Sequence, residues 1–129
     1  MNVGIVIVTH GDTGQSLIEV AEFVLGQSMD AIRVVKFDQS GNRPTVTADL
    51  RAALDGAEFG DGILVLTDLI GASPSNQVAE LLEKYKAVMV TGINVAMLIS
   101  VWNYRDSALG LLARKAIETG RRGVKIFQE

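Results

Sequence analysis

An uninterrupted apolar segment close to the amino terminus, residues 4–8, is followed at once by Thr9, His10 and Gly11. A run without polar alternation is typical of a strand covered on both faces, as in the middle of a parallel sheet. The next segment predicts a helix over residues 15–25, because its apolar side chains fall largely on one helical face: Leu17, Ile18, Ala21, Phe23, Val24 and Leu25. This order places His10 at the carboxyl end of a strand, where open α/β sheets bind ligands.

Apolar runs and helical patterns alternate along the rest of the chain. Further strands are predicted over residues 31–37, 62–67, 87–90 and 124–127. Arg33 and Lys36 indicate that the first of these is more exposed than the others. Helices are predicted from Thr45 or Thr47 to Ala57, from Ser73 to about Tyr85, from Asn94 to Trp102 and from Ser107 to Gly120. The alternation predicts an α/β fold: a doubly wound, mainly parallel sheet with helices on both faces.

The composition indicates one compact domain, residues 1–129, with no linker or internal repeat. The chain is 48% hydrophobic and carries a net charge of −3, without the basic patch typical of nucleic-acid binding. It contains no cysteine, which excludes disulfides and thiolate chemistry and suits a reducing compartment. The first apolar run lacks a basic leader, and no run approaches the length of a membrane span. We therefore expect a cytoplasmic protein that binds no nucleic acid.

Two residues able to carry chemistry follow the two most apolar strands. His10 ends the first strand, and Asp68 comes directly after residues 62–67. If these strands are neighbours, both side chains meet at one edge of the sheet. A carboxylate that accepts a proton from one imidazole nitrogen fixes the tautomer and leaves a lone pair on the other nitrogen. Such an imidazole is a nucleophile, and phosphorus is one natural target. The alternative is a surface histidine with no role.

A turn of small residues, Gly71, Ala72, Ser73 and Pro74, supplies a second part of the candidate site. Ser73 is a typical N-cap and Pro74 suits the first position of a helix, whose unpaired N–H groups can hold an oxyanion. Gly71 and Ala72 would let a phosphoryl group approach the backbone, and Gly11 would do the same at the first turn. A capped helix and a tight turn without any ligand are the alternative interpretation.

Other chemistries are weaker interpretations of the same residues. A metal site would have to combine His10 with Asp12 and Asp68, but no spacing typical of metal ligands is present, so no metal and no cofactor are predicted. Ser73 with His10 and Asp68 has the composition of a hydrolase triad, yet the serine lies in no Gly-x-Ser-x-Gly motif. The glycine motifs of nucleotide and dinucleotide binding are also missing.

Four segments spread over nearly the whole chain match the motifs of one family and occur in the same order: residues 5–11, 68–76, 92–98 and 118–125. On these segments the chain resembles the enzyme IIA component of the mannose class of the bacterial phosphoenolpyruvate-dependent sugar phosphotransferase system. The resemblance implies that His10 takes a phosphoryl group from the phosphocarrier protein HPr and passes it to an enzyme IIB partner. It also implies that Asp68 orients His10 and that Ser73 lies beside the phosphoryl group.

The resemblance further implies a homodimer in which the last strand, residues 124–127, runs antiparallel and crosses to the partner's sheet. The membrane would be reached only through a permease complex. Family members commonly have Gly-Gly-Ser-Pro-Phe-Asn where this chain has Ala72 and Ser75, and a common aromatic is replaced by Ile70. The catalytic set is therefore retained, whereas the surface that faces partner proteins differs.

The chain ends at Glu129 without a IIB domain, which indicates a free-standing component. Two roles follow from the resemblance, and they belong to different classes of function. One is a phosphotransferase component that carries phosphoryl groups for sugar uptake. The other is a regulatory module in which phosphorylation of His10 controls a protein partner without any transport. The sequence does not indicate which sugar would be transported, and it does not distinguish between these two roles.

Overall fold

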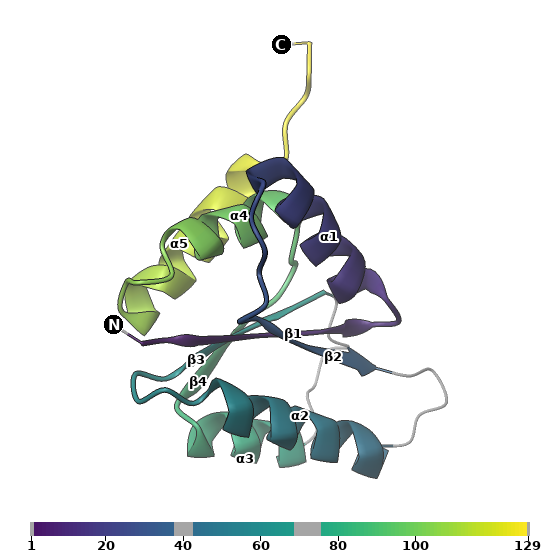
Figure 1. Cartoon of the computed structure of the whole chain (residues 1–129), viewed down its shortest axis with the longest axis vertical. Coiled ribbons are helices and arrows are strands. Elements are labelled where there is room, and N and C mark those ends of the chain that lie inside the picture. The colour runs from purple at the N-terminus through teal and green to yellow at the C-terminus, as the bar shows by residue number, and fades with distance from the viewer. Residues whose placement is uncertain (1, 38–42, 69–75, 129) are drawn as a thin grey trace.

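The computed structural model describes residues 2–37, 43–68 and 76–128. Strands and helices alternate as the sequence predicts, and two helices follow the last strand (Figure 1). In chain order the elements are β1 (Gly4–His10), α1 (Thr13–Leu25), β2 (Arg33–Phe37), α2 (Arg43–Ala57), β3 (Ile63–Thr67), α3 (Asn76–Lys84), β4 (Ala87–Val90), α4 (Val95–Asn103) and α5 (Leu109–Arg122).

All strand pairs of the sheet are parallel, and the strand order is β2-β1-β3-β4. The two most apolar strands, β1 and β3, are therefore the central neighbours, and Val8 pairs with Thr67 near their carboxyl ends. Figure 1 shows α1, α4 and α5 on one face of the sheet and α2 and α3 on the other. This confirms the predicted α/β class with helices on both faces, and β2 lies at an edge as Arg33 and Lys36 indicate.

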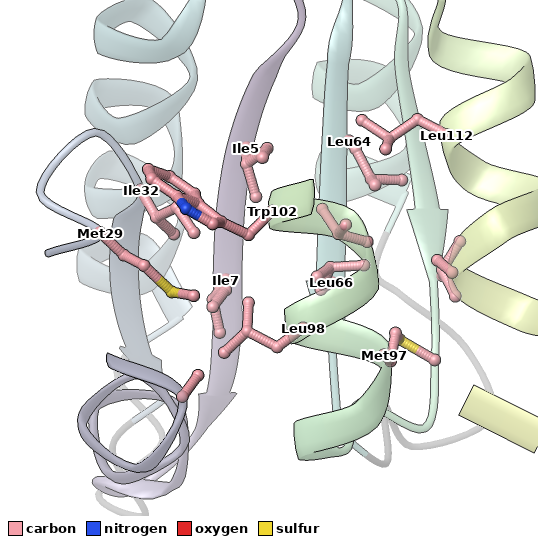
Figure 2. Close-up of a cluster of buried hydrophobic side chains, with 14 of the residues drawn as sticks. Ile5, Ile7, Met29, Ile32, Leu64, Leu66, Met97, Leu98, Trp102 and Leu112 are labelled. Atoms are coloured by element: carbon pink, nitrogen blue, oxygen red, sulfur yellow. The ribbon is translucent and has the colours of Figure 1, made fainter. Parts of the chain in front are cut away.

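The core consists of two apolar layers, one on each face of the sheet. Alternate side chains of a strand point to opposite faces, so Ile5 and Ile7 pack under α1, α4 and α5, whereas Val6 and Val8 pack against α2 and α3. Figure 2 shows the first layer, in which Trp102 of α4 lies beside Ile5, with Ile32 and Met29 close by. Burying one such large apolar side chain contributes roughly 1.5–3 kcal/mol. The two layers together hold the carboxyl ends of β1 and β3 in place.

Some helix predictions differ from the structure. The predicted apolar face of the first helix includes Phe23 and Val24, but these side chains are 89% and 60% exposed. The second helix begins at Arg43, not at Thr45 or Thr47, with Pro44 in its first turn. Proline is tolerated there because the first N–H groups of a helix have no partner within the helix.

The predicted last strand is not part of the sheet within a single chain. Residues 124–128 lie beyond α5 and contain no strand, and Figure 1 shows this end of the chain leading away from the layers. Val124, Ile126 and Phe127 are among the most exposed apolar side chains of the described residues. A strand needs a neighbouring strand for its N–H and C=O groups, and no strand of the described residues pairs with this segment. No helix in the described part of the chain is long and apolar enough to cross a membrane.

Candidate functional site

His10 and Asp68 meet at the carboxyl edge of the sheet, as the sequence predicts. His10 is the last residue of β1, and Asp68 directly follows the neighbouring β3. The imidazole Nδ1 lies 3.1 Å and 3.2 Å from the two carboxylate oxygens of Asp68. The backbone N–H of His10 also donates to Oδ2 of Asp68, at 2.9 Å. One carboxylate therefore fixes both the ring and the backbone of the histidine.

This geometry selects the chemistry that the ring can perform. A carboxylate accepts hydrogen bonds, so Nδ1 carries the proton that it shares with Asp68, and the lone pair of the neutral ring lies on Nε2. The His10 side chain is 55% exposed, whereas that of Asp68 is 21% exposed. A reacting group can thus approach the ring, while the carboxylate that would balance a positive charge on it is mostly shielded from water.

Two backbone hydrogen bonds join Thr67 and Asp68 to the segment that follows β4. The N–H of Gly92 donates to the carbonyl of Asp68, and the N–H of Ile93 donates to that of Thr67, both at 3.0 Å. Gly92 has φ of 80°, a left-handed conformation that glycine adopts without strain. Asn94 then caps α4 by accepting from the N–H of Met97 at 2.8 Å. The segment between β4 and α4 thereby holds the backbone at the end of β3, from which the Asp68 side chain extends.

The turn after His10 is built around two glycines. Gly11 has φ of +52°, and a Cβ there would meet no atom of the described residues within 4 Å other than those of its chain neighbours. Gly14 lies against the sheet, because a Cβ at this position would come within 2.8 Å of Cγ2 of Ile7. Its N–H donates to Oγ1 of Thr9 at 2.7 Å. Thr9 thus caps the first turn of α1 from the end of β1, a contact that the sequence analysis missed although this threonine interrupts an apolar strand.

Asp12, considered above as a metal ligand with His10 and Asp68, pairs instead with Lys36. Its Oδ1 lies 3.1 Å from Nζ of Lys36, and both side chains are more than half exposed. Across residues 2–37, 43–68 and 76–128, no three carboxylate or imidazole side chains lie close enough together to hold a metal ion. The ion pair ties the turn after His10 to the end of β2.

The predicted phosphoryl-binding residues Gly71, Ala72 and Ser73 lie outside the described residues, so their role stays a prediction. Of that set, the structure describes Gly11, which directly follows His10. A separate surface crevice of about 410 Å³ lies at the opposite, amino end of β1, and its lining includes Ile5, Phe59, Trp102 and Arg105. It does not contribute to the His10 site.

Comparisons with known proteins agree with this geometry. The family described as "PTS system fructose IIA component" matches residues 4–116. The PTS system mannose-specific EIIAB component of Escherichia coli K12 is 32% identical over 131 residues, which cover 99% of this chain. They cover 40% of that relative, so the chain spans less than half the length of the curated relatives it matches.

Solved structures show the same fold. The phosphotransferase system component EIIA from Streptococcus agalactiae superposes with a TM-score of 0.77 at 26% identity, covering 97% of both chains. The mannose/sorbose-specific IIA subunit from Enterococcus faecalis gives a TM-score of 0.85 at 22% identity, covering 100% of this chain and 97% of that one. The second likeness bears on the fold alone.

Proposed function

Since this chain belongs to the PTS system fructose IIA component family, we propose that it is a phosphoryl carrier of the phosphotransferase system. In this proposal His10 accepts a phosphoryl group from phosphorylated HPr and passes it to an enzyme IIB partner during sugar uptake. The observation that carries the proposal is the contact between Nδ1 of His10 and the carboxylate of Asp68, with the ring itself exposed. The phosphoryl transfer would take place in the cytoplasm, and the protein would contact the membrane only indirectly, through a permease complex.

The transfer step uses Nε2 as the nucleophile. Its lone pair attacks the phosphorus of the donor phosphohistidine, so that an N–P bond forms on His10 while the N–P bond of the donor breaks. The donor imidazole leaves with the electron pair. The ring of His10 becomes positively charged as the bond forms, and the Asp68 carboxylate on Nδ1 stabilises that charge without taking the proton. Transfer to IIB is the same step with His10 as the donor.

The exposure of the site suits a protein as the reaction partner. A phosphoryl group held on another protein can reach Nε2 only if both surfaces approach closely around the ring. His10 stands at the end of its strand with more than half of its side chain accessible. Glycine at position 11 presents no side chain next to the ring, and apart from its two chain neighbours no atom of the described residues lies within 4 Å of a Cβ built there.

The proposal is tested by incubating the protein with phosphoenolpyruvate, enzyme I and HPr, and measuring its intact mass. We expect the mass to rise by one phosphoryl group, in an adduct that is acid-labile and alkali-stable, as a phosphoramidate is. His10→Ala should take no phosphoryl group. Equal labelling of that variant would overturn the assignment, because the chain contains no other histidine. Passage of the label to a IIB protein would separate the carrier role from a regulatory one.

A further inference from the structure

The hydroxyl of Thr67 is a buried polar group that the resting fold does not explain. Thr67 is the last residue of β3, directly before Asp68, and it is 0% exposed. Its Oγ1 has no hydrogen-bond partner among the residues that the structure describes. Buried hydroxyls are nearly always paired, because removing one from water without a new partner is unfavourable. The unpaired Thr67 hydroxyl therefore indicates that a hydrogen-bond partner joins it in another state of the protein.

The fold itself does not need an oxygen at this position. The other residues of β3 are aliphatic, and valine would have the same shape as threonine with an equal preference for strands. Thr9, at the end of the neighbouring β1, is also 0% exposed, but its hydroxyl accepts the N–H of Gly14. The two threonines precede His10 and Asp68 respectively, and among the described residues the hydroxyl of Thr9 has a partner whereas that of Thr67 has none.

The register of the sheet places the unused hydroxyl on the same face as the His10 side chain. Thr67 pairs with Val8, and paired residues of neighbouring parallel strands point to the same face. His10 is two residues beyond Val8 along β1, so its side chain leaves from that face as well. Thr67 therefore lies on the strand next to His10, level with the residue two positions before it. In the chain, Thr67 directly precedes Asp68.

We propose that the Thr67 hydroxyl binds the phosphorylated state of this site, by donating a hydrogen bond to a phosphoryl oxygen on His10 directly or through one water. The inference rests on the proposed function of His10. A phosphoryl group brings negative charge and three strong acceptor oxygens to the edge of the sheet. A hydrogen bond to a charged acceptor is stronger than one between neutral groups. The donor that lacks a partner among the described residues of the resting protein thus gains one when the phosphoryl group arrives.

The test is the equilibrium constant for phosphoryl exchange with HPr, measured by separating phosphorylated from unphosphorylated protein after mixing with phospho-HPr. We expect Thr67→Val to shift this constant away from the phosphorylated chain by about 10-fold, the size of one hydrogen bond to a charged group. Thr67→Ser keeps the hydroxyl and should stay within about twofold of the wild type. The melting temperature of unphosphorylated Thr67→Val should rise, because the substitution removes an unpaired buried hydroxyl.

Ser100→Ala is the matched control. Its hydroxyl is also buried, but it accepts from Thr119 at 2.9 Å between α4 and α5, on the other face of the sheet. Its loss should lower the melting temperature and leave the exchange constant unchanged. An unchanged constant in Thr67→Val, or a lower melting temperature of that unphosphorylated variant, would overturn the inference alone. A wild-type protein that takes no phosphoryl group at all would overturn the proposed function and this inference with it.

Discussion

The carboxylate of Asp68 makes two kinds of contact with His10, and a single substitution separates them. The carbonyl oxygen of Asn at position 68 can still accept the backbone N–H of His10, which Oδ2 accepts at 2.9 Å in the wild type. The NH₂ group that then faces Nδ1 donates and does not accept, so the favoured tautomer carries its proton on Nε2 and the lone pair on Nε2 is lost. Asp68→Asn should therefore slow phosphoryl transfer by about 10²–10⁴-fold, by analogy with the orienting acid of a catalytic triad.

Rapid-quench measurement of transfer from phospho-HPr checks this expectation, with HPr affinity measured in parallel and expected to be unchanged. Asp12→Asn is the matched control, because Asp12 is an acid two residues from His10 that pairs with exposed Lys36. An exposed pair contributes only about 0.2–1 kcal/mol, so its loss should change the rate by less than about 5-fold. Wild-type transfer by Asp68→Asn would show that the pair with His10 is structural only.

The meeting of His10 and Asp68 could be predicted from the sequence because it depends on the backbone. Two strongly apolar runs tend to become central parallel strands, and parallel strands end at the same edge of the sheet. The pair of Asp12 with Lys36 could not be predicted in this way, because it depends on side-chain conformations on the surface. The same is true of Thr9, whose hydroxyl could have pointed to several neighbours until the close approach of Gly14 fixed the start of α1.

The close packing of α1 against the sheet can be tested at a glycine. Gly14 is the second residue of α1, and Gly110 is the second residue of α5 and serves as the comparison. Alanine is the better helix former by about 1 kcal/mol in a helix interior, and less near a terminus. Gly110→Ala should therefore stabilise the protein by up to about 0.5–1 kcal/mol, since no atom outside this turn of the helix, among the described residues, lies within 4 Å of the added Cβ. Gly14→Ala should instead destabilise it by about 1–3 kcal/mol, because the Cβ would lie 2.8 Å from Ile7.

Urea unfolding of both variants measures these changes. The opposite signs are the informative result, since helix propensity alone would make both substitutions favourable. If Gly14→Ala were as stable as Gly110→Ala, then α1 would be free to move away from β1. The turn that follows His10 would in that case be less rigid than the contact between Gly14 and Ile7 indicates.

A tyrosine at the end of α3 links this helix to α2. The hydroxyl of Tyr85 donates to Asp55, and this hydrogen bond, with smaller effects of burial and of the carboxylate charge, raises the pKa of Tyr85 above its ordinary value of 10.0. Because the pKa is raised in the folded state, the link stabilises the fold below pH 10 and is lost as the pH rises through the folded pKa. Ultraviolet titration of tyrosinate should show this late transition.

Asp55→Asn should return the titration of Tyr85 towards its ordinary range, since the first cause of the shift is the hydrogen bond to the Asp55 carboxylate. Tyr85→Phe identifies which part of the signal belongs to this residue. A transition that Asp55→Asn leaves in place would show that the carboxylate is not the cause.

The face predicted for the first helix was too wide, and the position of Phe23 shows why. At 3.6 residues per turn, successive side chains are about 100° apart. Leu17, Ile18, Ala21 and Leu25 then span about 100° of the circumference, and these are the residues that pack into the core. Phe23 falls more than 100° outside this stripe, which agrees with its 89% exposure. Counting apolar residues in the window overstated how many of them one face can hold.

At the scale of the whole molecule, the alternating pattern was sufficient to predict the layers. Parallel strands joined through helices must cross over the sheet, and right-handed crossovers leave few arrangements. The state of residues 124–127 could not be predicted from pattern alone, because a strand exists only where another strand offers it hydrogen bonds. The apolar residues Val124, Ile126 and Phe127 make this segment suitable for a strand, but a strand would need a neighbour from outside the single chain.

That neighbour is expected to be a second copy of the chain. Val124, Ile126 and Phe127 are 80%, 69% and 95% exposed, and β4 is paired on one side only within the described sheet, with Val88 40% exposed. Exposed strand edges favour pairing between chains, and a symmetric exchange would cover both edges with one repeated contact. The full-length protein should therefore be a stable homodimer, and deletion of the residues after Gly123 should make it monomeric in sedimentation equilibrium.

Phe23→Ser, which removes a similarly exposed aromatic on α1, should leave the dimer intact and so control for surface hydrophobicity. A monomeric full-length protein, or a truncated one that stays dimeric at low micromolar concentration, would contradict strand exchange.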